Sequence, residues 1–235
     1  RSYSVTGVQT CALPISVITA AEAASRVKAG DVVHLGGFLG CGCPDTIVKA
    51  LVAAGTKNLT LVCNDTGLYN EEKGRSNGPA PLVKQKAFKT MIVSHIGTNP
   101  ETQRQMNAGE SEVLLVPQGT LAERVRAAGN GLGGVLTPTG VGTEVEQGKQ
   151  KITLKGKEFL LEEALPGDVA LIKAKKADKA GNLVYAKTAR NFNPLMATSC
   201  TVVIAEVEEL VEIGAIDPDQ VHTPSIFVDF IVKAE

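Results

Sequence analysis

Apolar and polar positions alternate in a regular way between residues 17 and 137. Short runs rich in β-branched residues lie between longer stretches of helical composition. The runs are residues 32–35, 59–63, 91–93, 113–116 and 135–137. Strands that alternate with helices favour parallel pairing, because the connecting helices cover the sheet. The pattern therefore predicts an α/β fold with an open, mainly parallel sheet covered by helices on both faces.

Signals for helix ends accompany this alternation. Polar caps predict helix starts at Thr19 with Glu22 and at Thr120 with Glu123, both in capping-box spacing, and at Asn99 before Pro100. Glycine after alanine predicts helix ends at Gly30, Gly55, Gly109 and Gly129. These boundaries fall between the apolar runs, which supports the alternating pattern.

From about residue 143 the helical stretches give way to strand-like pieces separated by turn-rich segments such as KGK and LPGD. The pieces are residues 151–154, 158–161, 169–174, 183–186 and 201–207. We expect the C-terminal half to add antiparallel strands within the same domain. No linker or whole-domain repeat divides the sequence, so residues 17–235 are predicted to form a single domain.

Composition narrows the possible functions. The 235 residues are 43% hydrophobic and 21% charged with a formal net charge of -1, which provides no broad positive field for nucleic acid or a membrane surface. Aromatic residues make up 4% and Trp is absent, which argues against base-stacking platforms. No apolar run reaches the length of a membrane span. The five cysteines lack disulfide spacing, so a cytoplasmic location is expected.

The sequence of the first residues indicates an unusual origin. VTGVQTCALPI, residues 5–15, reads as the in-frame translation of a common sequencing-library adapter. We therefore expect residues 1–15 to be an assembly artefact and the natural protein to start near Ser16 or Val17. Amplification of the gene from source DNA tests this, because it should not recover those codons.

Polar residues that follow the predicted strands are the candidates for a site. Ligands of open parallel sheets bind beyond the carboxyl ends of the strands. The first four strands are followed there by residues 36–42, by Asn64 and Asp65, by Ser94 and His95, and by Gln118 and Gly119. We expect these groups to line one edge of the sheet. From position alone, Asn64 also fits a turn former and Gln118 a helix-entry residue.

The segment HLGGFLGCGCPDT, residues 34–46, is the most informative of these. Glycines let main-chain amides approach a ligand, and a helix starting near residues 44–46 would add its positive end, which predicts a cradle for an anion or oxyanion. A tight turn that needs glycine only for its conformation explains the spacing equally well. A metal site is not expected, because Cys41 and Cys43 lack a second pair of ligands. The predicted cradle consists of Gly36, Gly37, Phe38, Leu39, Gly40, Cys41 and Gly42.

Several segments together resemble one family. GGFLGCGCP, residues 36–44, resembles the GGF-x-x-x-G-x-P signature of the alpha subunit of family I CoA-transferases, and especially the acetate or butyrate:acetoacetate type. The likeness extends through SHIGTNPET (94–102), VPQGTLAERVRAAG (116–129), LTPTGVGT (136–143) and ARNFNPL (189–195), in the family's order. It covers residues 17 to 235 and departs from the pattern at Ala29-Gly30 and at His34, both upstream of the loop.

The resemblance implies transfer of CoA from an acyl-CoA to a short-chain carboxylate (acetate, butyrate or acetoacetate) through a glutamyl-CoA thioester. In two-chain members of the family that glutamate belongs to a beta subunit, and this chain has no ENG segment of the expected kind. The implied assembly is a heterotetramer, with CoA as a substrate and no permanently bound cofactor. By resemblance, residues 36–42 contact CoA or the acyl oxygen, and Gln118 and Asn64 direct amides at the carboxylate or oxyanion.

Two other functions fit the residues without the resemblance. A stand-alone sugar-phosphate isomerase or deacylase on a related α/β scaffold would bind an anion at the same sheet edge and carry its own catalytic carboxylate. A non-catalytic, ligand-binding regulatory subunit would need no nucleophile at all. Activity that appears only with a beta chain distinguishes the CoA-transferase from both.

Overall fold

The computed structural model describes residues 15–70 and 72–235. Its main sheet has the strand order β1-β14-β13-β11-β2-β3-β6-β7, with β12 beside β11. These strands are β1 (Ser16–Ile18), β2 (Val32–Leu35), β3 (Leu59–Val62), β6 (Phe88–Val93), β7 (Glu112–Leu115), β11 (Gly167–Asp178), β12 (Leu183–Val184), β13 (Cys200–Val211) and β14 (Phe230–Lys233). Neighbours in this order run parallel, and β12 runs antiparallel to β11. The predicted open, mainly parallel sheet is confirmed.

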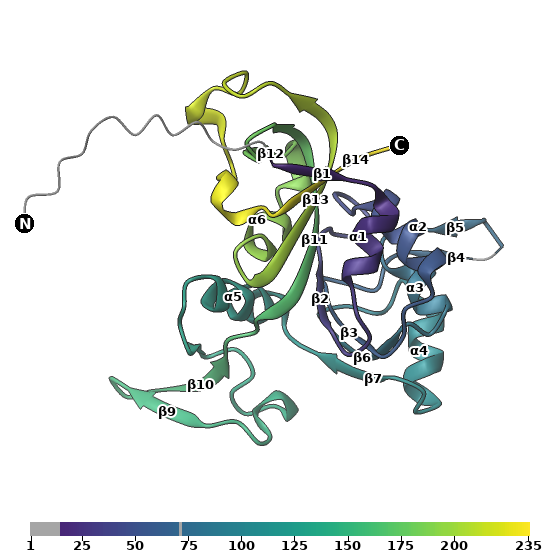
Figure 1. The fold of residues 1–235 in the computed structure, drawn as a ribbon. Coiled ribbons are helices and arrows are strands. Elements are labelled where there is room, and N and C mark those ends of the chain that lie inside the picture. Colours follow the sequence, from purple (N-terminus) through teal and green to yellow (C-terminus); the bar gives the residue numbers. More distant parts are fainter. Residues whose placement is uncertain (1–14, 71) are drawn as a thin grey trace, which may run out of the picture.

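Helices cover both faces of this sheet (Figure 1). One face carries α1 (Ala20–Arg26), α2 (Asp45–Ala54), α3 (Ala80–Lys84) and α4 (Pro100–Asn107), and the other carries α5 (Gln118–Gly129) and α6 (Asn193–Met196). Successive side chains of the central strand β11 point to opposite faces. Val169 and Leu171 join the core under the first group, whereas Ala170 and Ile172 join the core under the second. Both faces are therefore buried, as the apolar runs predict.

The predicted antiparallel strands of the C-terminal half are confirmed at 151–154, 158–161 and 183–184, but not at every piece. β8 (Gly134–Thr137), β9 (Lys151–Leu154) and β10 (Lys157–Glu163) form a separate antiparallel sheet that projects beside α5 (Figure 1). The run at residues 135–137 was expected to extend the parallel series, and this is wrong. The pieces at 169–174 and 201–207 instead form the parallel centre, because β11 pairs with β13 in register along most of its length.

Short elements complete the chain. A two-stranded hairpin joins β4 (Tyr69–Asn70) to β5 (Arg75–Ser76). Single 3₁₀ turns lie at η1 (Glu144–Glu146), η2 (Lys187–Ala189), η3 (Pro218–Gln220) and η4 (Ser225–Phe227). Of the predicted artefact, residues 1–15, only Ile15 lies among the described residues, and its amide donates to the carbonyl of Lys179 at 2.8 Å.

Two of the three predicted helix starts are confirmed. Thr19 and Glu22 form a reciprocal capping box, and the Asn99 side chain accepts from the first-turn amides of α4. Thr120 does not cap α5, which begins two residues earlier, at Gln118, directly after Pro117. Its hydroxyl is instead buried inside the first turn without a hydrogen-bond partner among the described residues.

The predicted helix ends are mostly correct. Gly55 follows α2 in the left-handed conformation, with φ +68°. Gly129 also marks a helix end, but as the last residue of α5 and not in the left-handed conformation, and Asn130 follows as the cap. Glycine is needed there for packing, since a Cβ would lie 2.1 Å from the Thr198 hydroxyl oxygen. Close approach, and not backbone conformation, explains this residue.

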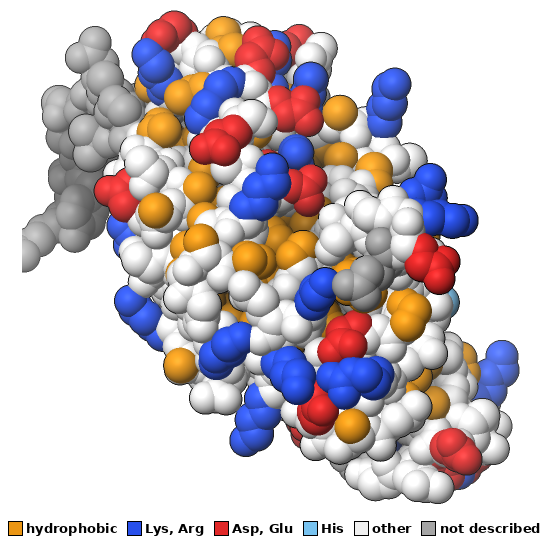
Figure 2. All heavy atoms as spheres, turned by 90° about the vertical axis from the view of Figure 1, so that its right-hand side faces the viewer, with side chains coloured by type: hydrophobic (Ala, Val, Ile, Leu, Met, Phe, Trp, Pro, Cys, Tyr) orange, Lys and Arg blue, Asp and Glu red, His pale blue; other side chains and the backbone are white. Residues whose placement is uncertain are grey.

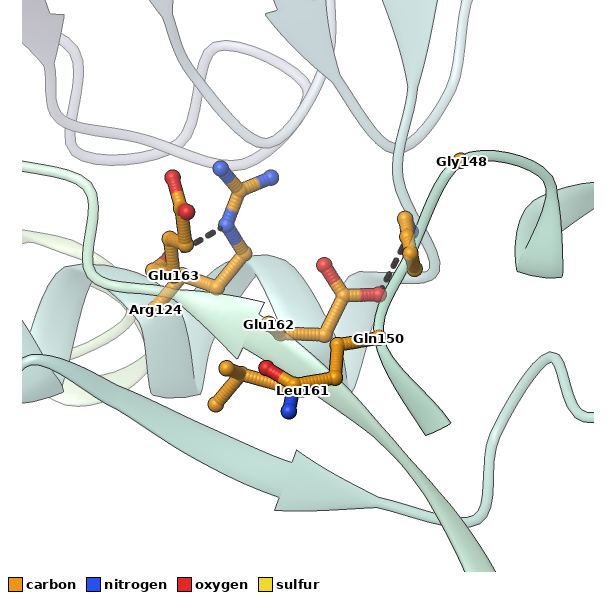
Figure 3. A pocket seen from close by; sticks show the side chains of 7 residues that line it. Arg124, Gly148, Gln150, Leu161, Glu162 and Glu163 are labelled. Atoms are coloured by element: carbon orange, nitrogen blue, oxygen red, sulfur yellow. Dashed lines mark hydrogen bonds and ion pairs between the residues drawn. The ribbon is translucent and has the colours of Figure 1, made fainter. Parts of the chain in front are cut away.

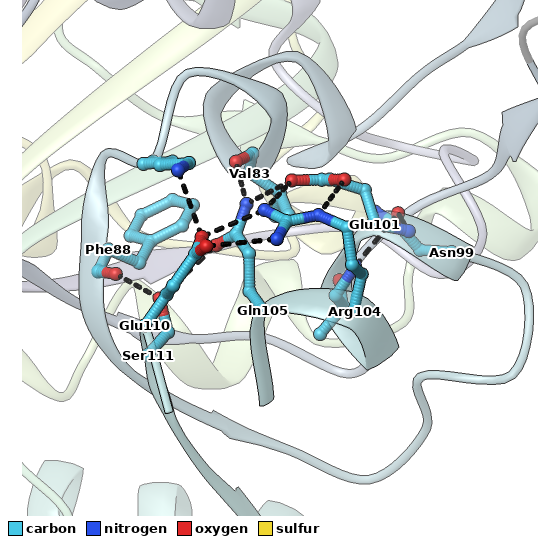
Figure 4. A network of polar contacts seen from close by, with 10 residues as sticks. Val83, Phe88, Asn99, Glu101, Arg104, Gln105, Glu110 and Ser111 are labelled. Atoms are coloured by element: carbon cyan, nitrogen blue, oxygen red, sulfur yellow. Dashed lines mark hydrogen bonds and ion pairs between the residues drawn. The ribbon is translucent and has the colours of Figure 1, made fainter. Parts of the chain in front are cut away.

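Surface charges of both signs are interspersed on the face that carries α2, α3 and α4 (Figure 2). A network on α4 is one example (Figure 4): Arg104 pairs with Glu101 and Glu110, while Gln105 donates to the carbonyl of Val83 at 2.7 Å. This arrangement ties α4 to its neighbours without a field of one sign. Within residues 15–70 and 72–235, no helix combines the length and apolar composition needed to cross a membrane.

Candidate functional site

The glycine loop between β2 and α2 contains a small hairpin. Phe38 donates to the carbonyl of Cys41 at 3.0 Å, and Cys41 donates to the carbonyl of Phe38 at 2.8 Å. The two residues between them, Leu39 and Gly40, have φ of +48° and +84°. Two positive φ values in a two-residue connection are typical of a type I′ turn. The loop is therefore a defined turn, with the Phe38 side chain 47% exposed.

Asp65 anchors this hairpin from the end of the neighbouring strand. It lies just beyond β3, is buried, and its Oδ2 accepts from the amide of Leu39 at 2.8 Å. Its Oδ1 accepts from the amide of Gly67, and the side chain of Asn64 donates to Oδ2 at 2.9 Å. The sequence placed Asp65 at the correct sheet edge but suggested no role for it. The position after a buried strand was the available signal.

Three amides of the loop have no hydrogen-bond partner within the part of the chain that the structure describes. Among the described residues, the N–H groups of Gly37, Gly40 and Gly42 make no hydrogen bond, whereas the other amides of residues 36–43 do. Gly37 is buried, and Gly40 and Gly42 are partly buried. Unsatisfied donors in such positions are unusual in folded proteins and point to a ligand or solvent partner. The loop therefore has free donors, and those of Gly40 and Gly42 belong to residues that line one cavity.

The helix after the loop does not contribute its positive end to this cradle, contrary to prediction. The first free amides of α2, those of Thr46 and Ile47, donate at 2.8 and 3.1 Å to Oε2 of Glu206. Glu206 lies on β13, is 1% exposed, and its other oxygen is 3.4 Å from the ammonium group of Lys173. Burial raises the pKa of Glu206 above its ordinary value. An internal carboxylate thus occupies the helix terminus, and only loop amides remain for a ligand.

A cavity of about 210 Å³ adjoins the loop. Its charged lining consists of Asp45, Lys173, Lys175 and Glu208, and burial raises the pKa of Asp45. Its remaining lining residues are Gly40, Cys41, Gly42, Cys43, Ala174, Ala186 and Ala189. Gly40, Cys41 and Gly42 of the predicted cradle therefore line a cavity, at the end of the sheet where β2 leads into α2.

Gln118 lies in a different cavity, of about 540 Å³, between the start of α5 and strand β8. It is exposed at the first position of α5, and the cavity contains none of residues 36–42. Asn64 is 2% exposed and its amide is held by Asp65 and Ser94. The structure therefore brings Asn64 to the glycine loop through Asp65. It does not bring Gln118 into the same cavity.

A third cavity, of about 370 Å³, contains none of the predicted site residues (Figure 3). There the buried carboxylate of Glu162 pairs with Lys149 at 2.6 Å, and the Arg124 guanidinium donates to the carbonyl of Glu163 at 2.8 Å. Of the charged groups that line this cavity, Lys149 and Glu162 neutralise each other. It lies between α5 and β10, in the projecting part of the molecule.

The two loop cysteines do not form a pair. Cys41 is exposed, with its sulfur 3.2 Å from the hydroxyl oxygen of Thr188, while Cys43 is buried in the core. Burial raises the pKa of the Cys43 thiol well above its ordinary value. No group of three or more His, Cys, Asp or Glu side chains suited to a metal ion occurs within the part of the chain that the structure describes.

Comparison with known proteins assigns the chain to a family. Residues 17–234 match the family model described as "Coenzyme A transferase". The chain belongs to the coenzyme A transferase family. Acetate CoA-transferase subunit alpha of Escherichia coli (strain K12) is 47% identical to it over 219 residues, which cover 93% of this chain and 97% of that protein. This membership favours CoA transfer over the isomerase, deacylase and regulatory alternatives.

A second relative supports the coenzyme A transferase family, and a solved structure supports the fold. The acetoacetyl-CoA:acetate/butyrate CoA transferase alpha subunit of Clostridium acetobutylicum is 46% identical over 209 residues, covering 89% of this chain and 93% of that one. The solved acyl-CoA transferase of Escherichia coli O157:H7 has the same fold, with a TM-score of 0.83 at 20% identity over 98% of this chain. This chain spans about half, 48%, of that longer polypeptide.

Proposed function

We propose that this chain is the alpha subunit of a two-chain CoA-transferase that moves CoA from an acyl-CoA to a short-chain carboxylate, with acetate, butyrate or acetoacetate as the substrate class. The names of the two relatives support the proposal, because they contain these acids and the designation of an alpha subunit. The partner is a beta subunit, and a heterotetramer is the proposed assembly. The cytoplasm is the proposed location, since the four described cysteines are all free thiols.

The unpaired amides of Gly37, Gly40 and Gly42 carry this proposal. When a carboxylate attacks a thioester, negative charge develops on the carbonyl oxygen, and fixed N–H donors stabilise that charge. Each half-reaction exchanges one acyl bond for another, so no electrons are transferred and no permanently bound cofactor is needed. Gly36, Phe38, Leu39 and Cys41 complete the turn that holds these donors.

The nucleophile is assigned to the beta subunit. The buried carboxylates of the described residues all accept hydrogen bonds or ion pairs from their own chain: Asp65, Glu162, Asp178 and Glu206. A carboxylate committed in this way is a poor attacker, because those interactions are lost on forming a thioester. The complete site is therefore shared between two chains, with the glycine loop on this one.

Co-expression with a CoA-transferase beta chain tests the proposal. The assembled pair should exchange CoA between acetyl-CoA and butyrate or acetoacetate, and this chain purified alone should be inactive. A beta chain whose nucleophilic glutamate is replaced by glutamine is the control, and should assemble without activity. Transfer by the isolated chain, or an assembled pair inactive with every short-chain carboxylate, would contradict the proposal.

A further inference from the structure

The segment ARNFNPL, residues 189–195, lies against the glycine loop although about 150 positions separate them in the sequence. The side chain of Asn191 donates to the carbonyl of Cys41 at 3.0 Å and to that of Thr188 at 2.8 Å. The side chain of Asn193, which is fully buried, donates to the carbonyl of Gly42 at 3.0 Å. Two consecutive carbonyls of the loop are thus held by two asparagines.

Peptide geometry links these bonds to the unpaired donors. A trans peptide unit is planar, so its carbonyl and the following N–H point in opposite directions. The carbonyl of Cys41 and the unpaired N–H of Gly42 belong to the same peptide unit. Asn191 therefore fixes the direction of the Gly42 donor through the Cys41 carbonyl, which also accepts from Phe38.

Asn193 fixes the loop at both ends. Its Nδ2 donates to the carbonyls of Gly42 and Ala189, and its Oδ1 accepts from the amide of Lys173 on β11 at 3.0 Å. The same Oδ1 lies over Gly36, where an added Cβ would come within 1.9 Å of it. One buried amide therefore contacts the first residue of the loop, its last residue and the central strand.

We propose that Asn191 and Asn193 are positioning residues that hold the glycine loop in its donor conformation. The inference rests on the proposed function of that loop. Neither side chain needs to contact the substrate, because both act through the carbonyls of Cys41 and Gly42. Removing either asparagine side chain leaves the loop sequence intact. Without Asn191, the peptide unit that carries the Gly42 N–H loses a hydrogen bond, and without Asn193 the next peptide unit does.

Asn191 provides the more direct test, because it is only partly buried. Asn191→Ala and Asn191→Asp, measured in the assembled two-chain enzyme, should lower kcat at least about tenfold and leave KM for acyl-CoA within about twofold. Asp keeps the size of the side chain but cannot donate to a carbonyl. Asn130→Ala is the matched control: Asn130 also donates to a carbonyl, that of Arg126, but at the exposed end of α5. Its kcat should not change.

Asn193 is tested together with Gly36, because Asn193→Ala alone removes three hydrogen bonds of a buried side chain and is expected to destabilise the fold. The backbone of Gly36 is outside the left-handed region, so the Asn193 amide is the obstacle to alanine there. Gly36→Ala alone should lower the unfolding temperature and the yield of the complex. Adding Asn193→Ala should raise the unfolding temperature again, while kcat remains at least about tenfold low. Recovery of kcat along with stability would reduce Asn193 to a packing residue.

Hydrogen–deuterium exchange of peptides that cover residues 36–43 gives a readout independent of transfer. The Asn191 variants should exchange faster there than the wild type, and Asn130→Ala should not. Unchanged exchange and unchanged kcat in the Asn191 variants would overturn the inference. An inactive wild-type pair with faster loop exchange in the variants would instead contradict the proposed function and support the positioning of the loop.

Discussion

At the scale of single residues, Gly37 is a loop position where both the backbone conformation and a close backbone neighbour oppose a side chain. Its φ is +123°, and a Cβ would lie 3.2 Å from the amide nitrogen of Cys43. Gly37→Val should therefore distort the cradle and lower kcat/KM of the assembled enzyme at least about tenfold. Gly109→Val is the control, since Gly109 also has a positive φ but has no neighbour within 4 Å. Equal kinetics for the two variants would remove Gly37 from the site.

Gln118 is the predicted site residue whose role the geometry supports least directly. It is exposed in a cavity that none of residues 36–42 line, so it acts only if a ligand or the beta subunit reaches both places. Under the proposed function, Gln118→Ala should reduce turnover of the assembled enzyme about tenfold with assembly intact. Gln147→Ala, another exposed glutamine, should have no effect. Unchanged turnover in Gln118→Ala would mean that Gln118 and its cavity take no part in catalysis.

His34 gives the fold a predicted pH dependence. It is fully buried beside Ser199, and desolvation lowers its pKa from 6.5 to about 4. Between pH 6.5 and pH 4 the imidazole of His34 is protonated in the unfolded chain and neutral in the folded chain. The free energy of unfolding therefore falls as pH drops below about 6.5, and the loss is complete near pH 4. The loss between pH 7 and pH 5 should be roughly 2 kcal/mol.

Urea unfolding at pH 7 and at pH 5 measures the contribution of His34 to the free energy of unfolding. His34→Gln should be less stable at pH 7 yet lose less stability on acidification than the wild type. His95→Gln should keep the wild-type pH dependence. An equal loss in wild type and His34→Gln would show that other groups dominate acid sensitivity.

At the scale of secondary-structure elements, Glu206 determines where α2 begins. It replaces a local cap, because Pro44 at that position offers no side-chain hydrogen bond. Glu206→Ala should leave two buried amides unsatisfied and lower the free energy of unfolding by about 1–3 kcal/mol. Glu208→Ala, on the same strand but exposed and paired with Lys175, should change it by less than about 0.5 kcal/mol. Chemical denaturation of the two variants gives the comparison.

The elements that the sequence could predict are those determined by neighbours in the chain. The spacing of apolar residues identified β2, β3 and β6, and capping residues identified the starts of α1 and α4. Each of these signals lies within a few residues of the element that it predicts. The partner of a strand is a long-range property, so β8 was assigned to the wrong sheet. The site shows the same division. The glycine loop was visible locally, whereas Asp65, Asn191 and Asn193 contact it, and Glu206 contacts the start of α2, across at least 26 positions.

At the scale of the whole molecule, the cavities at Gln118 and at Glu162 both lie between α5 and the β8-β10-β9 sheet, apart from the cavity at the glycine loop. The cavity at the glycine loop, about 210 Å³, is small for a substrate the size of CoA. A beta chain that extends this hollow would supply both the missing surface and the nucleophile. The separate positions of Gln118 and the loop then fit a site completed only by assembly.

The strand order also constrains how the molecule is made. β14, the last strand that the structure describes, lies between β1 and β13, so it alone joins β1 to the main sheet. On the ribosome, β1 therefore has no place in the sheet until residues 230–233 have been synthesised. We expect truncation before residue 230 to leave β1 detached and to expose the apolar edge of β13.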